Sequence, residues 1–138
     1  MHLTKVTLKN YGVYRDKVEF DLTTTPDKPV ILIGGTNGAG KTTLFESILI
    51  GFYGQSYFDK KTTRKEYEKF LGNKVHRYLG TTAAADSTSI VVDFKFYHNG
   101  VVDDYTVDRT WYDNDGRLTE ELKIKKNNKR LDAVEESQ

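Results

Sequence analysis

The chain has 138 residues, of which 37% are hydrophobic and 30% are charged, and its formal net charge is +1. This composition indicates a soluble domain with one modest core rather than a disordered tail. The net charge is too small to indicate a nucleic-acid binder. The absence of cysteine excludes disulfides and thiolate zinc sites. Because no apolar run is long enough to span a bilayer and the first residues do not resemble a signal peptide, we expect no membrane contact and a cytoplasmic location.

The first 29 residues predict two strands. Apolar residues alternate with polar ones in residues 4–8 and again in residues 18–22, which is the pattern of a half-buried strand. Asn10-Tyr11-Gly12 predicts a turn after the first strand. Pro26 and Pro29 bracket the connection from the second strand to the next segment.

The most specific motif follows this connection. Gly35-Thr36-Asn37-Gly38-Ala39-Gly40-Lys41-Thr42 fits G-x-x-x-x-G-K-[ST], the phosphate-binding loop of nucleotide hydrolases. The apolar run Val30-Ile31-Leu32-Ile33 before it predicts a buried parallel strand, and residues 43–50 after it predict a helix. This helix is apolar on most sides, so we expect it to be buried and to end near Gly51 or Gly54.

The residue types in this loop fit a nucleoside triphosphate. Its glycines allow a backbone curvature that a Cβ would hinder, so successive N–H groups can point toward a phosphate, which also faces the positive end of the helix. Lys41 would reach the β- and γ-phosphates as the catalytic cation, the Thr42 hydroxyl would ligate Mg²⁺, and Thr43 would add a hydroxyl near the α-phosphate. The alternative is a glycine-rich turn without a ligand, which the motif and both of its flanks disfavour. The predicted binding residues are Asn37, Gly38, Ala39, Gly40, Lys41, Thr42 and Thr43.

Residues 55–88 are less regular. Thr63-Arg64-Lys65-Glu66 matches a capping box, and Tyr67, Phe70 and Leu71 follow at helical spacing, which predicts a short helix. Residues 81–89 are small and polar without apolar periodicity, and they predict an exposed loop.

The last third of the chain predicts an antiparallel β-meander over residues 89–131. Apolar residues alternate in residues 90–96, then in 105–111, and more loosely in 118–124. Turn residues separate the three strands at residues 98–100 and 113–116, and Asn127-Asn128 closes the third.

Efficient ATP hydrolysis also requires a second acidic residue near Mg²⁺ and a group that positions the attacking water. Asp93, which follows Ile90-Val91-Val92, is the nearest candidate. The alternation continues through Phe94-Lys95-Phe96, however, so we assign Asp93 to the exposed face of a strand. The chain also has no Leu-Ser-Gly-Gly-like signature. We therefore expect the N-terminal part of a split ATPase, which binds ATP but turns it over poorly by itself.

Four segments together give a more specific pattern: residues 8–15 (Leu-Lys-Asn-Tyr-Gly-Val-Tyr-Arg), 29–35 (Pro-Val-Ile-Leu-Ile-Gly-Gly), the phosphate loop, and Ile50-Gly51-Phe52-Tyr53-Gly54. This pattern resembles the N-terminal lobe of the SMC/RecF-type ABC ATPases. Within that class the chain is most similar to the DndD family, the ATPases of bacterial DNA phosphorothioation systems. The alternating strand over residues 105–111 also resembles the β-meander of that family.

The resemblance implies an α/β fold, that of a P-loop NTPase of the ABC/SMC head type, with a mixed sheet and an antiparallel β-meander. Residues 1–138 would form its N-terminal lobe, divided into a strand pair, P-loop and helix (1–54), a helical and loop excursion (55–88) and the meander (89–131). The second acidic motif and the signature motif would follow a long coiled coil, and the glutamine loop would lie beyond the meander. ATP and Mg²⁺ would be the cofactors. The partners would be the C-terminal lobe of the same protein, a second head in a head-to-head dimer, DNA, and other DNA sulfur-modification proteins.

Three features outside the loop have both a functional and a structural interpretation: Arg15, the aromatic residues of the strands, and a basic run near the end of the chain. In the SMC/RecF class a basic residue after the first strand lies near the nucleotide phosphates, which implies that role for Arg15, and the alternative is a solvated turn arginine. Trp111 and the tyrosines could stack on bases, but alternation favours packing. The basic run could contact DNA phosphates, although acidic residues flank it and charge runs are usually exposed faces. The basic run consists of Lys123, Lys125, Lys126, Lys129 and Arg130.

The three histidines are not spaced as metal ligands, so we expect them at the surface. They are His2, His76 and His98.

The expected function is to couple ATP binding and hydrolysis to DNA handling during sulfur modification of the DNA backbone. A DNA-repair ATPase of the same class would keep the site and change the pathway. A transporter-type ATP-binding subunit is disfavoured by the turn at residues 10–14 and by the long excursion after the helix. A nucleotide-dependent interaction module without turnover is a further alternative.

Overall fold

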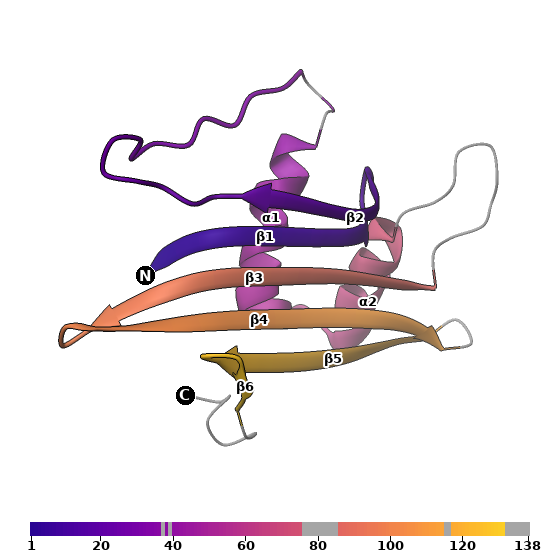
Figure 1. The fold of residues 1–138 in the computed structure, drawn as a ribbon. Helices are drawn as coiled ribbons and strands as arrows, with labels where there is room; N and C mark the ends of the chain where they lie inside the picture. Colours follow the sequence, from indigo (N-terminus) through magenta and orange to yellow (C-terminus); the bar gives the residue numbers. More distant parts are fainter. Residues whose placement is uncertain (37, 39, 76–85, 115–116, 132–138) are drawn as a thin grey trace.

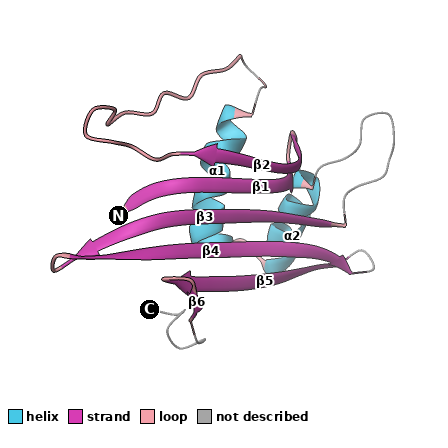
Figure 2. Ribbon diagram, in the orientation of Figure 1, coloured by secondary structure: helices cyan, strands magenta, loops and turns pink. Residues whose placement is uncertain are grey.

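The computed structural model describes residues 1–138 except residues 37, 39, 76–85, 115–116 and 132–138. One six-stranded sheet, in the order β2-β1-β3-β4-β5-β6, forms the body of the described part, and two helices cover one of its faces (Figure 1, Figure 2). The elements are β1 (His2–Tyr11), β2 (Tyr14–Asp21), α1 (Lys41–Tyr53), the short 3₁₀ helix η1 (Gly54–Tyr57), α2 (Arg64–Lys74), β3 (Ser87–His98), β4 (Val101–Asn114), β5 (Arg117–Lys126) and β6 (Lys129–Arg130).

Most elements predicted from the sequence are present. The two N-terminal strands, the helix after the glycine loop and the three-stranded meander are confirmed, although the first turn lies at Gly12 and Val13 because β1 extends to Tyr11. Thr63 and Glu66 form the predicted reciprocal capping box of α2. The turn between β3 and β4 has two consecutive residues with positive φ, as a tight hairpin requires. Within the described residues, neither helix has the length and hydropathy needed to cross a bilayer.

The core lies between the sheet and the helices, and β1 is central to it. Val6 of β1 pairs with Phe20 of β2 on one side and with Val92 of β3 on the other. Helix α1 approaches β3 so closely that a Cβ on Gly51 would lie 2.9 Å from the Cγ2 atom of Ile90. Gly51 therefore has a packing role inside the helix, and Gly54, with a positive φ of +54°, caps its end. The fully buried side chains include Val6, Leu8, Leu44, Ile50, Ile90, Val92 and Trp111.

The predicted buried parallel strand at Val30–Ile33 is wrong for this structure. Residues 29–36 form no strand, and Val30 and Leu32 are 79% and 92% exposed, although Ile33 packs against the core. Every pair among the six described strands is antiparallel, so the predicted mixed sheet is also wrong. An apolar run becomes a buried strand only where neighbouring strands accept its backbone hydrogen bonds. No described strand lies beside this run.

Two further predictions need correction. Helix α1 is buried only along the stripe that faces the sheet, and Phe45 and Leu49 on its other side are 54% and 42% exposed. Of the predicted loop 81–89, residues 81–85 lie outside the described residues, but Ser87–Ser89 belong to β3. Their polar composition does not prevent strand formation, because Ser89 pairs with Lys9 of β1 and with Thr110 of β4.

A buried ionic network holds the C-terminal end of α1 against the sheet. Arg109 of β4 donates hydrogen bonds to the carbonyl oxygens of Gly51 (3.2 Å) and Phe52 (3.5 Å) and pairs with Glu120 of β5 at 2.6 Å. Glu120 also accepts from Arg64 of α2 at 2.8 Å. The Arg109 guanidinium thus donates to carbonyl oxygens at the end of α1. Together with Glu120 it links β4 and β5 to both helices.

We expect Arg109→Met to lower the free energy of unfolding by about 2–4 kcal/mol, because it leaves buried carbonyl oxygens and a nearly buried carboxylate without their main donor. Lys123→Met is the matched control, because the Lys123–Glu121 pair is about 40% exposed and its loss should change stability by less than about 1 kcal/mol. Urea unfolding of both variants measures the difference. A loss below about 1 kcal/mol for Arg109→Met would contradict the role of the network.

Candidate functional site

No side chain caps the backbone N–H groups at the N-terminal end of α1. Gly40 is the N-cap residue, in the left-handed conformation with φ 101° and ψ 8°, and no side chain caps the helix. The first turn of α1 also contains no acidic residue. By contrast, α2 has both a Thr63 cap and Glu66 in its first turn. The positive end of the α1 dipole is therefore available to an anion.

The structure brings most of the predicted binding residues together around this helix end. A cavity of about 460 Å³ is lined by residues of the loop and of the first turn of α1, and by Val13. The Nζ atom of Lys41 donates to the carbonyl oxygen of Gly35 at 2.5 Å, so the lysine reaches back across the loop. Asn37 and Ala39 lie outside the described residues. The cavity lining is Val13, Gly38, Gly40, Lys41, Thr42 and Thr43.

The turn between β1 and β2 packs directly on the end of the loop and the first turn of α1. A Cβ on Gly12 would lie 2.9 Å from the Cγ2 atom of Thr43, and the Tyr14 hydroxyl donates to the carbonyl oxygen of Gly40 at 2.9 Å. Gly12 has a positive φ of +58°, a conformation that a glycine adopts readily. The family resemblance placed Arg15 near the phosphates, but no pattern in the sequence indicated the contacts that Gly12 and Tyr14 make.

Arg15 lies on β2 directly after Tyr14. Its side chain is 64% exposed and forms an ion pair with the neighbouring Asp16 at 3.6 Å. A position near bound phosphate therefore stays a prediction for this residue.

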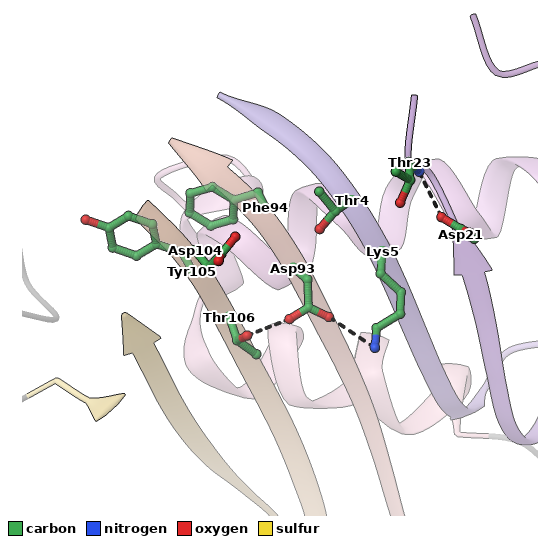
Figure 3. A pocket seen from close by; sticks show the side chains of 9 residues that line it. All are labelled: Thr4, Lys5, Asp21, Thr23, Asp93, Phe94, Asp104, Tyr105 and Thr106. Carbon is green, nitrogen blue, oxygen red and sulfur yellow. Dashed lines mark hydrogen bonds and ion pairs between the residues drawn. The ribbon is translucent and has the colours of Figure 1, made fainter. Parts of the chain in front are cut away.

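Asp93 lies on the opposite face of the sheet from the loop helix. Ile90 and Val92 face Gly51 of α1, so the alternating Asp93 points to the face without helices. There it pairs with Lys5 at 3.7 Å and accepts from the Thr106 hydroxyl at 2.5 Å, beside a hollow of about 430 Å³ (Figure 3). The assignment of Asp93 to an ongoing strand is confirmed, and its carboxylate is committed to these two partners.

The structure also describes several other residues that have two interpretations. Trp111 is 1% exposed, so the packing role is confirmed. In the basic run, Lys123 pairs with Glu121 and Lys126 pairs with Asp103, and contact of this run with DNA stays a prediction. His2 and His98 are exposed, as expected, and His76 lies outside the described residues. Among the described residues no group of three or more histidine or acidic side chains could hold a metal ion.

The glycine loop, the uncapped helix end and the Lys41-Thr42 pair at its first turn define the class of P-loop NTPases. The chain belongs to the AAA domain family, whose model matches residues 5–138. It is similar to the SbcC component of the SbcCD nuclease of Vibrio cholerae, with 32% identity over 62 residues, 45% of this chain and 6% of the relative. It is also similar to the DNA double-strand break repair Rad50 ATPase of Archaeoglobus fulgidus, with 33% identity over 108 residues, 78% of this chain and 9% of the relative.

The chain thus spans less than a tenth of the length of either relative. These similarities support an SMC/Rad50-like ATPase head.

We expect Gly40→Ala to lower the free energy of unfolding by about 1–3 kcal/mol, because an L-residue is strained at this φ and its Cβ would lie 2.5 Å from the Tyr14 hydroxyl oxygen. Gly72→Ala is the control. Gly72 lies inside α2, and a Cβ at this position would have no atom within 4 Å, so alanine should raise stability by about 0.5–1 kcal/mol. Thermal unfolding of the two variants tests the opposite signs, and equal shifts would contradict the proposed strain.

Proposed function

We propose that this chain is the ATP-binding part of an SMC/Rad50-like ATPase that couples ATP hydrolysis to DNA handling. The observation that supports it best is the geometry at the start of α1, where Gly40 leaves the helix end uncapped and Lys41 reaches back over the loop to Gly35. A helix end with this arrangement favours a polyphosphate over a neutral ligand.

Each residue of the loop has a role in this proposal. Lys41 would contact the β- and γ-phosphates, where its charge offsets the charge that develops during phosphoryl transfer. Thr42 and Thr43 line the cavity. The Thr42 hydroxyl would ligate Mg²⁺, and the Thr43 hydroxyl would lie near the α-phosphate. Arg15, on the adjoining β2, would add a second cation near the phosphates. When bound, Mg·ATP supplies the phosphoryl group that is transferred to water.

The catalytic site is composite in this proposal. Val30 and Leu32 in the segment before the loop and Phe45 and Leu49 of α1 are exposed apolar residues. Further strands of the same protein, from its C-terminal lobe, would cover them. That lobe would supply the second carboxylate, because Asp93 lies on the far face of the sheet. Two such heads would then meet with ATP between them, each completing the site of the other.

Two DNA pathways are open to such an ATPase. The names of the two relatives, a nuclease component and a double-strand break repair ATPase, favour DNA repair. The resemblance of residues 8–15 and 105–111 to the DndD family favours DNA phosphorothioation, with other sulfur-modification proteins as partners. Deletion of the gene separates them: loss of sulfur from genomic DNA supports phosphorothioation, whereas sensitivity to double-strand breaks with no change in sulfur supports repair.

We expect Lys41→Ala to abolish ATP binding while the domain stays folded, because the substitution removes the cation of the loop and no core contact. Isothermal titration calorimetry with Mg·ATP measures the affinity, and circular dichroism checks the fold. Lys69→Ala, on the exposed side of α2, is the control and should bind ATP like the unchanged protein. Unchanged ATP affinity in Lys41→Ala would remove the assignment of the loop.

We expect residues 1–138 alone to bind Mg·ATP but to hydrolyse it more slowly than about 10⁻³ per second, the order of a phosphoryl-transfer site that lacks its completing groups. Single-turnover phosphate release measures the rate. Brisk hydrolysis that does not depend on protein concentration would overturn the composite site. Binding without turnover in the full-length protein with DNA would instead indicate a nucleotide-dependent interaction module.

A further inference from the structure

The carbonyl oxygen of Gly40 is the point where the phosphate loop meets the rest of the protein. It accepts the N–H of Leu44 at 2.9 Å, a backbone hydrogen bond of the first helical turn. It also accepts the hydroxyl of Tyr14 at 2.9 Å. One hydrogen bond therefore starts α1, and the other joins the loop to β2.

Tyr14 is itself held firmly. It begins β2, and its ring packs edge-on against Phe20 with ring centres 5.4 Å apart. Burial raises the pKa of the Tyr14 hydroxyl, so this group stays protonated and able to donate throughout the neutral pH range. The donor is thus held in place by the sheet rather than by the loop.

The turn that precedes Tyr14 is anchored from the other side. The Gly12 N–H donates to the carbonyl oxygen of Lys74, at the end of α2, at 2.5 Å. Tyr11 forms an isolated β-bridge with Val75, the residue after α2. Lys74 in turn pairs with Glu46 of α1 at 3.2 Å. These contacts fix the turn relative to both helices, so Tyr14 reaches Gly40 from a rigid support.

The space around Gly40 shows how closely the turn and the loop fit. A Cβ on Gly40 would lie 2.5 Å from the Tyr14 hydroxyl oxygen and 2.8 Å from the Cγ2 atom of Val13. Gly40 has a φ of +101°, and this conformation sets the direction in which the loop leaves the helix. A contact that holds the Gly40 carbonyl therefore also holds the orientation of the loop.

We propose that Tyr14 is a positioning residue for the phosphate loop, and that its hydroxyl, by holding the Gly40 carbonyl, keeps the loop in the conformation that binds polyphosphate. The proposal rests on the proposed function, because it requires that the loop binds a nucleotide. Tyr14 acts through Gly40 and makes no contact with the ligand in this mechanism. Its effect should consequently depend on the phosphates and be independent of the base.

The test is Tyr14→Phe in the full-length protein, which removes the hydroxyl and keeps the ring against Phe20. Affinities for Mg·ATP, Mg·ADP and magnesium tripolyphosphate are measured by calorimetry. Loss of one hydrogen bond that orders the loop should weaken all three by the same factor, roughly three- to tenfold. Tyr112→Phe is the matched control, because it removes a tyrosine hydroxyl that contacts Glu121 at 3.4 Å on an exposed part of β4, and all three affinities should stay unchanged.

The outcomes separate this proposal from its alternatives. Unchanged affinities in Tyr14→Phe would overturn the positioning role while the nucleotide site stands. A loss for ATP and ADP without a loss for tripolyphosphate would also overturn it, because the hydroxyl would then contact the nucleoside. A loss of equal size in Tyr112→Phe would show a general effect of hydroxyl removal and overturn it as well. Failure of the unchanged protein to bind any of the three ligands would instead refute the proposed function, and the positioning role with it.

Discussion

The close packing of α1 on the sheet is the constraint on which the position of the phosphate loop depends. Gly51 allows the helix to approach Ile90 of β3, and Arg109 binds the carbonyl oxygens at the C-terminal end of the helix. A helix of 13 residues is stiff along its axis, so an end held against β3 and β4 also determines where the other end lies. Contacts at the C-terminal end of α1 therefore help to position Lys41 and Thr42 at its N-terminal end. The turn at Gly12–Tyr14 adds direct contacts with Gly40 and Thr43.

The first turns of the two helices differ: the first turn of α2 is capped by side chains of its own, and the first turn of α1 is not. This difference distinguishes a helix end with a structural role from one that can bind a ligand. Helix α2 satisfies its N-terminal donors with its own Thr63 and Glu66, as a helix does when nothing else binds there. Helix α1 begins at a glycine with no cap and no acidic residue in its first turn. With a net charge of only +1, the protein as a whole attracts anions weakly, so attraction of a polyphosphate has to be local, and this helix end and Lys41 are local sources of it.

The sequence predicts local features of this fold well and distant contacts poorly. The capping box, the Asn99-Gly100 hairpin and the alternation of the meander depend on neighbours in the chain, so the pattern was sufficient. Val30–Ile33 fits a buried strand equally well by pattern, but burial depends on partner strands, and none of the described strands pairs with it. The same limit applies to Tyr14, since its contact with Gly40 joins residues 26 positions apart. The composition of Gly35–Thr42 identifies the ligand class, but not the groups that hold the loop.

In the proposed function, binding and turnover of the nucleotide would depend on different sides of α1. The side that faces the sheet is complete, because Leu44, Ile50 and Gly51 are buried. Tyr14 of β2 contacts the end of the loop at Gly40, and α2 supports the turn before Tyr14. On the other side, Phe45 and Leu49 are largely exposed. Asp93 cannot bridge the two, since the sheet lies between its carboxylate and the helix and its partners are Lys5 and Thr106. In the proposed function, the catalytic carboxylate would come from a part of the protein that covers this exposed side, and hydrolysis would then depend on assembly of the complete head.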